Sequence, residues 1–248
     1  MDIKIVFLVL VIGLFSCRKA SERACFKGKG EEASLEVPFV GDVDSLLLYD
    51  DLFYTLIQGK QSKVVLSGGE NLLGHIEIFS ENGKLTIKNK NKCNFLRSFK
   101  NKISALIYVD SVRSIHYEGS SELKSEDTLH SQELRLSITD GAGDVELTLK
   151  NGYTSAVITH GFGNFKLFGE TNSAFLNCST NSYCDTRSFV AKNWLTVNSN
   201  TVSSMLINGN TANLDVIIRE KGDVKYIGTP LSKTIKRSGK GRLIDLNN

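Results

Sequence analysis

The sequence has very little net charge, and this excludes one broad class of partner. Its 248 residues carry 30 Lys and Arg against 27 Asp and Glu, which gives a formal net charge of +3. A protein that binds nucleic acid through the phosphates needs a clustered basic face. We therefore expect no nucleic-acid partner.

Proline is scarce, with 2 residues against 21 glycines. Glycine, serine and asparagine recur between stretches rich in Val, Ile and Thr, and this pattern is typical of short strands joined by tight turns. A hydrophobic fraction of 41% is enough for a real core, so the composition is not that of a disordered chain. The length suits one large all-β or repeat domain with little helix.

No apolar run in the chain is long enough to span a bilayer. The run from Ile5 to Phe15 has about half the necessary length and leads into "LFSC", which ends at Cys17. The segment resembles the bacterial lipoprotein signal, which implies cleavage before Cys17 and acyl chains on its sulfur and its new amino group. Several acyl chains anchor a protein durably. The alternative is an ordinary cleaved signal followed by an incidental cysteine.

This signal predicts the organisation of the N-terminal region and the location of the protein. Residues 1–16 form the signal peptide, and residues 17–33 form the lipidated cysteine with a flexible tether. We expect the protein in the cell envelope, attached to the outer membrane through its N-terminal lipid, with the membrane face and the oligomeric state left open. An exported protein can form disulfides, and four further cysteines can pair in three ways: Cys25, Cys93, Cys178 and Cys184.

The chain lacks the close ligand pairs of a metal site. No two cysteines are spaced as C-x-x-C, and the four histidines are scattered along the sequence. The glycine-bearing segments also lack the strand, helix and lysine context of a phosphate-binding loop. We therefore expect no metal and no cofactor.

A unit of about 20 residues repeats through the second half of the chain. We aligned the units on a small residue before one of their two strands, and the anchors are 22, 20, 21, 19, 19 and 19 residues apart. Most units place apolar residues two and four positions after the anchor, as a strand with one buried face does. The unit at Cys184 fits badly, because Thr186 and Ser188 are polar at these positions. The anchors are Ser121, Gly143, Gly163, Cys184, Ser203, Gly222 and Gly241.

Such a short unit cannot bury its apolar face alone, whereas stacked copies form continuous sheets around one core. We therefore predict an all-β fold in which residues 34–248 form a single-stranded parallel β-helix, right-handed as parallel crossovers usually are. A β-sandwich is the alternative, but it gives no reason for a constant two-strand period. Before the repeats, Asn82 and Gly83 lie between two alternating segments and predict a β-hairpin.

Several segments together resemble the autotransporter-adhesin head GIN domain family of bacterial envelope proteins, which is common in lipoproteins of the Bacteroidota. They are "ACFKGKG", the stretch from "QGKQSKVVLSGGENLLGHIEIF" to "SALIYV", "GAGDVELTL" and "GDVKYIGTP". The resemblance covers nearly the whole chain after the signal. It implies a β-helical envelope protein with no established catalytic activity, and a disulfide between Cys25 and Cys93.

We expect a non-catalytic, adhesin-like or structural lipoprotein that presents sheet faces to a glycan or protein partner. The alternative is a carbohydrate-active enzyme, a polysaccharide lyase or hydrolase, on the same scaffold. Glycoside hydrolysis needs two carboxylates at a set separation, whereas the neighbours Asp50 and Asp51, like Glu126 and Asp127, would point to opposite faces of a strand.

One segment mixes aromatic and basic residues in a way that suits binding. Phe95, Arg97 and Phe99 could stack on sugar rings or contact a protein partner. Packing beside a disulfide is the simpler interpretation.

Overall fold

The computed structural model describes residues 28–92, 102–211 and 213–247. Cys17, Cys25 and Cys93 lie outside these ranges, as do Phe95, Arg97 and Phe99. The lipidation, the disulfide and the binding segment predicted at these positions therefore stay predictions. Within the described ranges nearly every element is a strand, and no helix there is long and apolar enough to cross a membrane.

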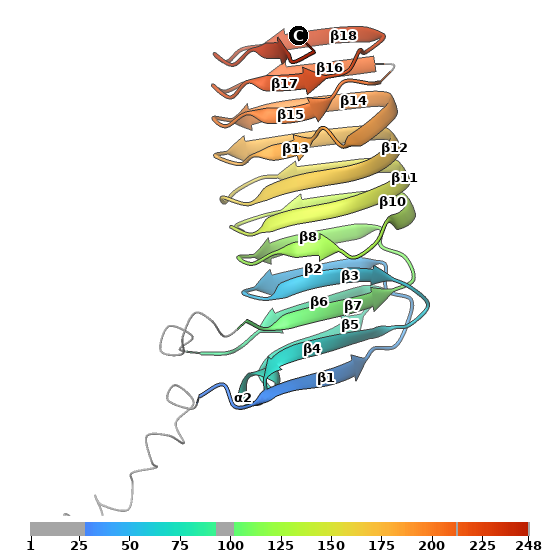
Figure 1. The fold of residues 1–248 in the computed structure, drawn as a ribbon, viewed down its shortest axis with the longest axis vertical. Helices are drawn as coiled ribbons and strands as arrows, with labels where there is room; N and C mark the ends of the chain where they lie inside the picture. Colours follow the sequence, from blue (N-terminus) through green and yellow to red (C-terminus); the bar gives the residue numbers. More distant parts are fainter. Residues whose placement is uncertain (1–27, 93–101, 212, 248) are drawn as a thin grey trace, which may run out of the picture.

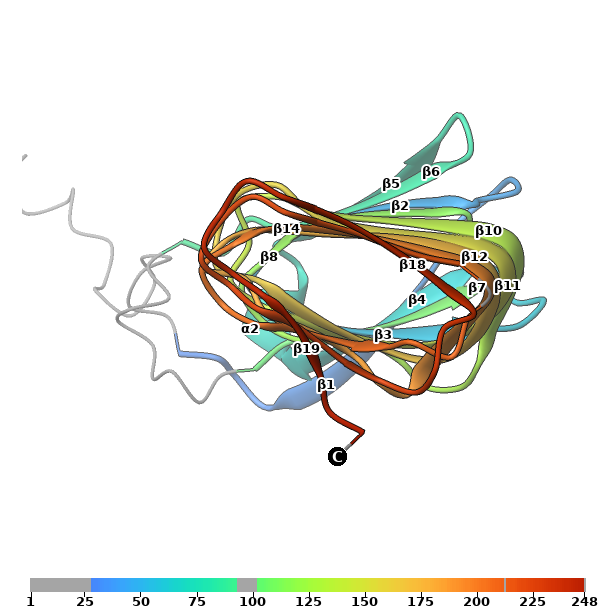
Figure 2. The ribbon, with the colours of Figure 1, turned by 90° about the horizontal axis from the view of Figure 1, so that it is seen from above.

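Two layers of strands face each other across one continuous core (Figure 2). We call them face 1 and face 2. Face 1 consists of β5 (Ile76–Glu81), β6 (Lys84–Asn89), β2 (Ser45–Asp50), β8 (Ser114–Gly119), β10 (Leu129–Ile138), β16 (Asn213–Ile218) and β18 (Ser232–Arg237). Face 2 consists of β1 (Glu32–Pro38), β4 (Lys63–Gly69), β7 (Ser104–Val109), β3 (Phe53–Gln58), β9 (Leu123–Ser125), β13 (Cys184–Thr186), β15 (Met205–Asn208), β17 (Val224–Ile227) and β19 (Leu243–Asp245).

Three long strands bend and take part in both faces: β11 (Asp144–Ile158), β12 (Asn164–Thr180) and β14 (Phe189–Thr201). Each pairs in parallel with the next, so that Asp144 lies beside Asn164, 20 residues later. Parallel pairing continues through the following strands to β19. The predicted solenoid with about 20 residues per coil is therefore confirmed. The alternative β-sandwich is excluded because its neighbouring strands are antiparallel.

The pairing register corrects one unit of the predicted repeat. Phe165 pairs with Cys184, and Cys184 pairs with Met205. Cys184 thus occupies the inward position two residues after the anchor, and Ser182 takes the anchor position. Thr186 is fully buried and faces the core beside Ile207 of the next coil. Its hydroxyl donates to the Leu206 carbonyl at 3.3 Å. The misfit in the sequence arose because a cysteine and a threonine occupy the two inward positions, where most other units have larger apolar residues.

Glycine is required at two of the corners by the coil stacked next to them. A Cβ at Gly143 would lie 1.8 Å from the carbonyl oxygen of Ser121, and one at Gly222 would lie 1.9 Å from that of Ser203. Backbone of one coil therefore rests directly on backbone of the next. This contact explains why glycine recurs at the corners of the coil.

The N-terminal coils do not stack in chain order. The coil of β2 and β3 lies between the coil of β6 and β7 and the coil that begins with β8 (Figure 1). Three strands at this end are antiparallel to their neighbours, since β4 pairs with β1 and β7, and β5 pairs with β6. Glu32 and Ala33, assigned to the tether from the sequence, belong to β1. This end, with the short helix α2 (Glu70–Leu73), closes the solenoid.

The predicted hairpin is confirmed. β5 and β6 are antiparallel, and Asn82 and Gly83 connect them with φ angles of 51° and 75°. Positive φ at both central residues is the geometry that an Asn-Gly pair favours, because its twist matches that of the flanking strands.

Candidate functional site

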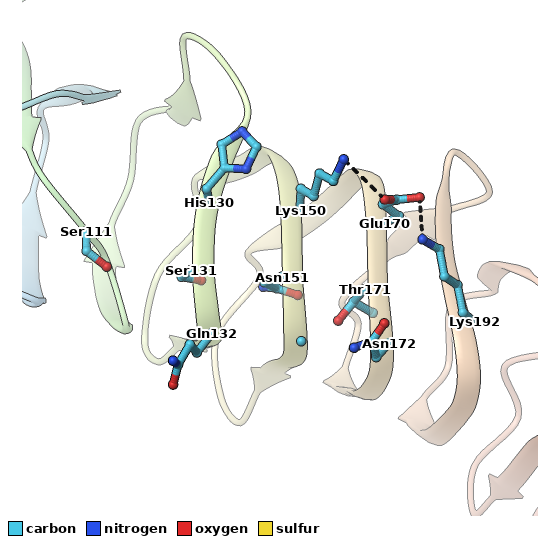
Figure 3. A pocket seen from close by; sticks show the side chains of 11 residues that line it. Ser111, His130, Ser131, Gln132, Lys150, Asn151, Glu170, Thr171, Asn172 and Lys192 are labelled. Atoms are coloured by element: carbon cyan, nitrogen blue, oxygen red, sulfur yellow. Dashed lines mark ion pairs between the residues drawn. The ribbon is translucent and has the colours of Figure 1, made fainter.

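A polar groove of about 710 Å³ lies along the bend between the two faces (Figure 3). Its walls come from β10, β11, β12 and β14, with Ser111 at one end. The bend is where each coil turns from face 2 to face 1, so side chains at equivalent positions of successive coils line up. The groove therefore runs along the stack, and no single loop forms it.

A charged row forms the upper rim of the groove in Figure 3. His130, Lys150 and Glu170 are paired in register, and Lys192 follows on β14. The Glu170 carboxylate accepts an ion pair from Lys192 at 2.9 Å and another from Lys150 at 3.7 Å. The hydrogen bond from Lys192, with a smaller contribution from Lys150, lowers the pKa of Glu170. Glu170 is therefore ionised at neutral pH, and the two lysines leave the row with excess positive charge.

Hydroxyl and amide side chains form the rest of the groove. Ser131, Asn151 and Thr171 are in register one residue after the charged row. The exposed amides of Gln132 and Asn172 follow. The Thr171 hydroxyl is buried and donates to the Ser173 carbonyl, whereas Ser131 and the exposed amides can donate and accept hydrogen bonds without carrying charge. The groove is thus suited to a ligand with many hydroxyl groups or to the polar surface of a protein.

Sequence reasoning did not single out these groove residues. The signal was present, because His130, Lys150 and Glu170 recur at intervals of 20 residues. A polar residue at a repeat position is usually solvated surface, and only the stacking of the bends shows that these side chains meet.

The pair Asp50 and Asp51, considered for catalysis, serves another role. Asp50 accepts a hydrogen bond from the backbone N–H of Asn89 at 2.9 Å, and Asp51 contacts the hydroxyl of Ser121. Both carboxylates tie neighbouring coils together. Across the described ranges, no group of His, Cys, Asp and Glu residues is placed to hold a metal ion.

Two of the cysteines lie inside the solenoid as free thiols. Cys178 on β12 and Cys184 on β13 are both fully buried. Burial raises the pKa of the Cys184 thiol, and a hydrogen bond with Cys178 raises it further. They fill core positions on either side of one corner, and neither contributes to the groove.

Solved structures of other proteins share this fold. A putative adhesin from Bacteroides fragilis NCTC 9343 superposes with a TM-score of 0.79 at 17% identity, over 87% of this chain and 97% of its own. A putative adhesin from Parabacteroides merdae gives 0.67 at 15% identity, over 89% and 98%. A putative lipid binding protein from Parabacteroides distasonis gives 0.60 at 16% identity, over 89% and 98%. At such identities the likeness concerns the fold alone.

No curated protein matches the sequence. The model of one protein family does match, over residues 44–230, and its description is "Putative auto-transporter adhesin, head GIN domain". The match spans well over half of the chain and includes the strands that form the groove. The chain therefore belongs to the auto-transporter adhesin head GIN domain family.

Proposed function

We propose that this protein is a non-catalytic, adhesin-like binding module of the cell envelope, which holds a glycan or protein partner along the bend groove. The groove carries the proposal, because it is an extended polar surface built from consecutive coils. An extended partner can follow such a surface from coil to coil. The adhesin-like family supports a binding role at the envelope or cell surface.

The groove chemistry supports binding over hydrolysis. Glycoside hydrolases use two carboxyl groups, one of them kept protonated to donate to the leaving group. Glu170 is the one carboxylate among the groove residues, and its lysine partners lower its pKa. It is therefore suited to orienting Lys150 and Lys192.

Attachment to the outer membrane through Cys17 is part of the proposal. The apolar run before Cys17 supports it, since a short run that ends at a cysteine suits a cleaved and acylated signal. The intact mass of the native protein should show acyl chains on Cys17 and none of the residues before it. A native mass without the acyl increment would remove this part of the proposal. Non-reducing peptide mapping tests the proposed bridge between Cys25 and Cys93.

A glycan array probed with the full chain in detergent tests the binding role. We expect selective binding that Lys192→Glu weakens, because this change places two acids side by side in the groove. Lys225→Glu, on face 2, is the matched control and should bind normally. A parallel assay for released reducing sugar should stay at background. Release of sugar would favour the carbohydrate-active enzyme. Equal binding by the Lys192→Glu and Lys225→Glu variants would mean that the glycan does not bind in the groove.

A further inference from the structure

The outer surface of face 1 carries, beside the groove, two aromatic residues with a small hydroxyl side chain between them, and we call these three residues the slot. Tyr153 of β11, Ser173 of β12 and Trp194 of β14 are paired in register on three neighbouring strands. Two strand spacings, about 9.6 Å, therefore separate the two aromatic residues, with a small hydroxyl side chain between them. Phe175 lies two residues beyond Ser173, on the same side of β12, because side chains alternate along a strand.

Trp194, the single tryptophan of the chain, is both exposed and held in place. Its side chain is 45% exposed, and its indole N–H donates to the Asp215 carboxylate at 3.1 Å. Between Ala191 and Trp194, β14 has one residue more than the matching segment of β12. Such a bulge re-aims the side chains next to it, and bulges are frequent beside functional sites. A large ring fixed at the surface loses little freedom when it binds a ligand.

The dimensions and chemistry of the slot fit a sugar ring. Carbon atoms in contact lie about 3.5–4 Å apart, so strands that lie about 9.6 Å apart leave room for one flat ring between the side chains of Tyr153 and Trp194. The negative face of an aromatic ring attracts the polarised C–H groups on the face of a sugar. Next to the rings, the hydroxyls of Ser173, Ser155 and Thr196 can bond the hydroxyl groups of the sugar.

The charged groups next to the slot are bonded within the protein, as Asp215 is to the Trp194 indole and Lys192 is to Glu170. The surroundings of the slot therefore favour an uncharged ligand, and its strands disfavour a peptide. The row that contains Tyr153 and Trp194 has Glu133 at one side and Asn213 at the other, and Arg135 pairs with Glu133 at 3.1 Å. A peptide that adds a strand needs an unpaired strand edge. The strands of the slot offer none, because β11, β12 and β14 each have strand partners on both sides.

We propose that the slot of Tyr153, Ser173 and Trp194 binds one pyranose ring of a neutral polysaccharide, whose chain continues into the bend groove. The proposal rests on the binding role proposed above and names the chemical class of its partner. Asn172 in the groove directly precedes Ser173, and Lys192 comes two residues before Trp194, so one ligand can contact both surfaces.

Tryptophan fluorescence reports on this site directly, because Trp194 is the single source of indole emission. We would titrate the full chain in detergent with dextran, laminarin and galactomannan, and separately with anionic polygalacturonate. At least one neutral polysaccharide should change the emission in a saturable way. Tyr153→Ala should weaken this binding by about tenfold or more, as loss of a stacking ring does. Phe162→Ala removes an aromatic side chain that is 67% exposed in a turn, and this control should bind normally.

The outcomes separate the slot from the groove. The proposal would be overturned if no neutral polysaccharide changed the tryptophan emission, or if polygalacturonate alone changed it. So would unchanged affinity of a folded Tyr153→Ala variant, with folding checked by circular dichroism and affinity by calorimetry. If the array detects a glycan whose binding needs Lys192 but not Tyr153, the slot fails while the proposed function stands.

Discussion

At the scale of single residues, the stability of the solenoid depends on atoms that connect one coil to the next. Thr201 is fully buried and donates to the carbonyls of Thr180 and Ser182 in the preceding coil, at 3.0 and 2.8 Å. Asn164 accepts from the backbone N–H of Tyr183, and Asp223 from that of Arg242. Small polar side chains at the corners thus satisfy backbone groups of the neighbouring coil, which would be costly to leave unpaired.

Gly143→Ala should destabilise the fold by about 1–3 kcal/mol, because the new methyl group would overlap the Ser121 carbonyl and force the two coils apart. Gly59→Ala is the matched control, since a Cβ there would meet no atom within 4 Å. Urea denaturation measures both free energies of unfolding. Equal values for the two variants would contradict the proposed contact between coils.

Asp185 should make stability depend on pH. Hydrogen bonds from the Arg187 side chain, at 2.6 and 3.0 Å, lower the pKa of Asp185 from its usual 3.8. A folded pKa below the unfolded value adds stability above about pH 4, and this stability is lost as the pH falls through the folded pKa. Asp185→Asn should therefore be less stable than the wild type near pH 6, by less than about 1 kcal/mol for a partly exposed pair.

Near pH 2.5 the difference between the two proteins should become small. Urea denaturation midpoints at the two pH values check this. A difference of the same size at both would assign the effect to packing and not to charge.

At the scale of elements, the strand at the C-terminal end shows how the stack is closed. β18 has β16 as its strand partner, and all of its residues are exposed. Lys233 and Arg237 pair with Leu214 and Ile218, which are inward-facing core residues of the preceding coil. The rows of inward-facing residues through Leu214 and Ile218 therefore end in charged side chains, while the row between them, through Val216, ends in the half-exposed Ile235. Inward-pointing charges are one way to keep a sheet edge from adding further strands.

Replacing Lys233 with Leu and Arg237 with Ile should extend the apolar columns to the end of the molecule. We expect the double variant to self-associate through this end, with a sedimentation coefficient that rises with concentration. Lys236→Leu is the matched control, because Lys236 pairs with the outward-facing Ile217. A double variant that sediments like the wild type at all concentrations would show that these charges do not protect the edge.

At the scale of the whole molecule, stability should be distributed along the stack, because each regular coil contacts mainly its neighbours. A chain that ends at Leu231 loses β18 and β19 and with them one coil interface. We expect it to keep its β-sheet circular dichroism spectrum and to melt at a lower temperature than the full chain. Complete loss of the β-sheet signal would mean that the last coil is needed to fold the others.

We expect the coil of β2 and β3 to tolerate mutation less well than the C-terminal coil does. β2 pairs with β6 on one side and β8 on the other, so this coil joins the N-terminal end to the regular repeats. Leu48 of β2 is fully buried, and Leu48→Ala should cost about 2–5 kcal/mol. Urea denaturation measures this loss. A loss well below this range would mean that the core around β2 closes over the deleted atoms.

The sequence by itself determined the strands, the turns and the period of the coil, because alternation of apolar residues and the position of glycine are local properties. The hairpin at Asn82 and Gly83 belongs to this class. The register at Ser182 and Cys184 needed the tertiary structure, since a buried threonine and cysteine do not look like a core strand in sequence.

The out-of-order coil and the two surfaces were also decided by tertiary structure alone. Nothing local to β2 and β3 says that they stack against β8, because that choice depends on which strand edges the other strands leave unpaired. In the sequence, Glu170 is only a polar residue at a repeat position. In the fold, its coil lies between those of Lys150 and Lys192, and its carboxylate forms ion pairs with both lysines. Tyr153 and Trp194 are likewise 41 positions apart in the sequence, and pairing through Ser173 brings them into one row.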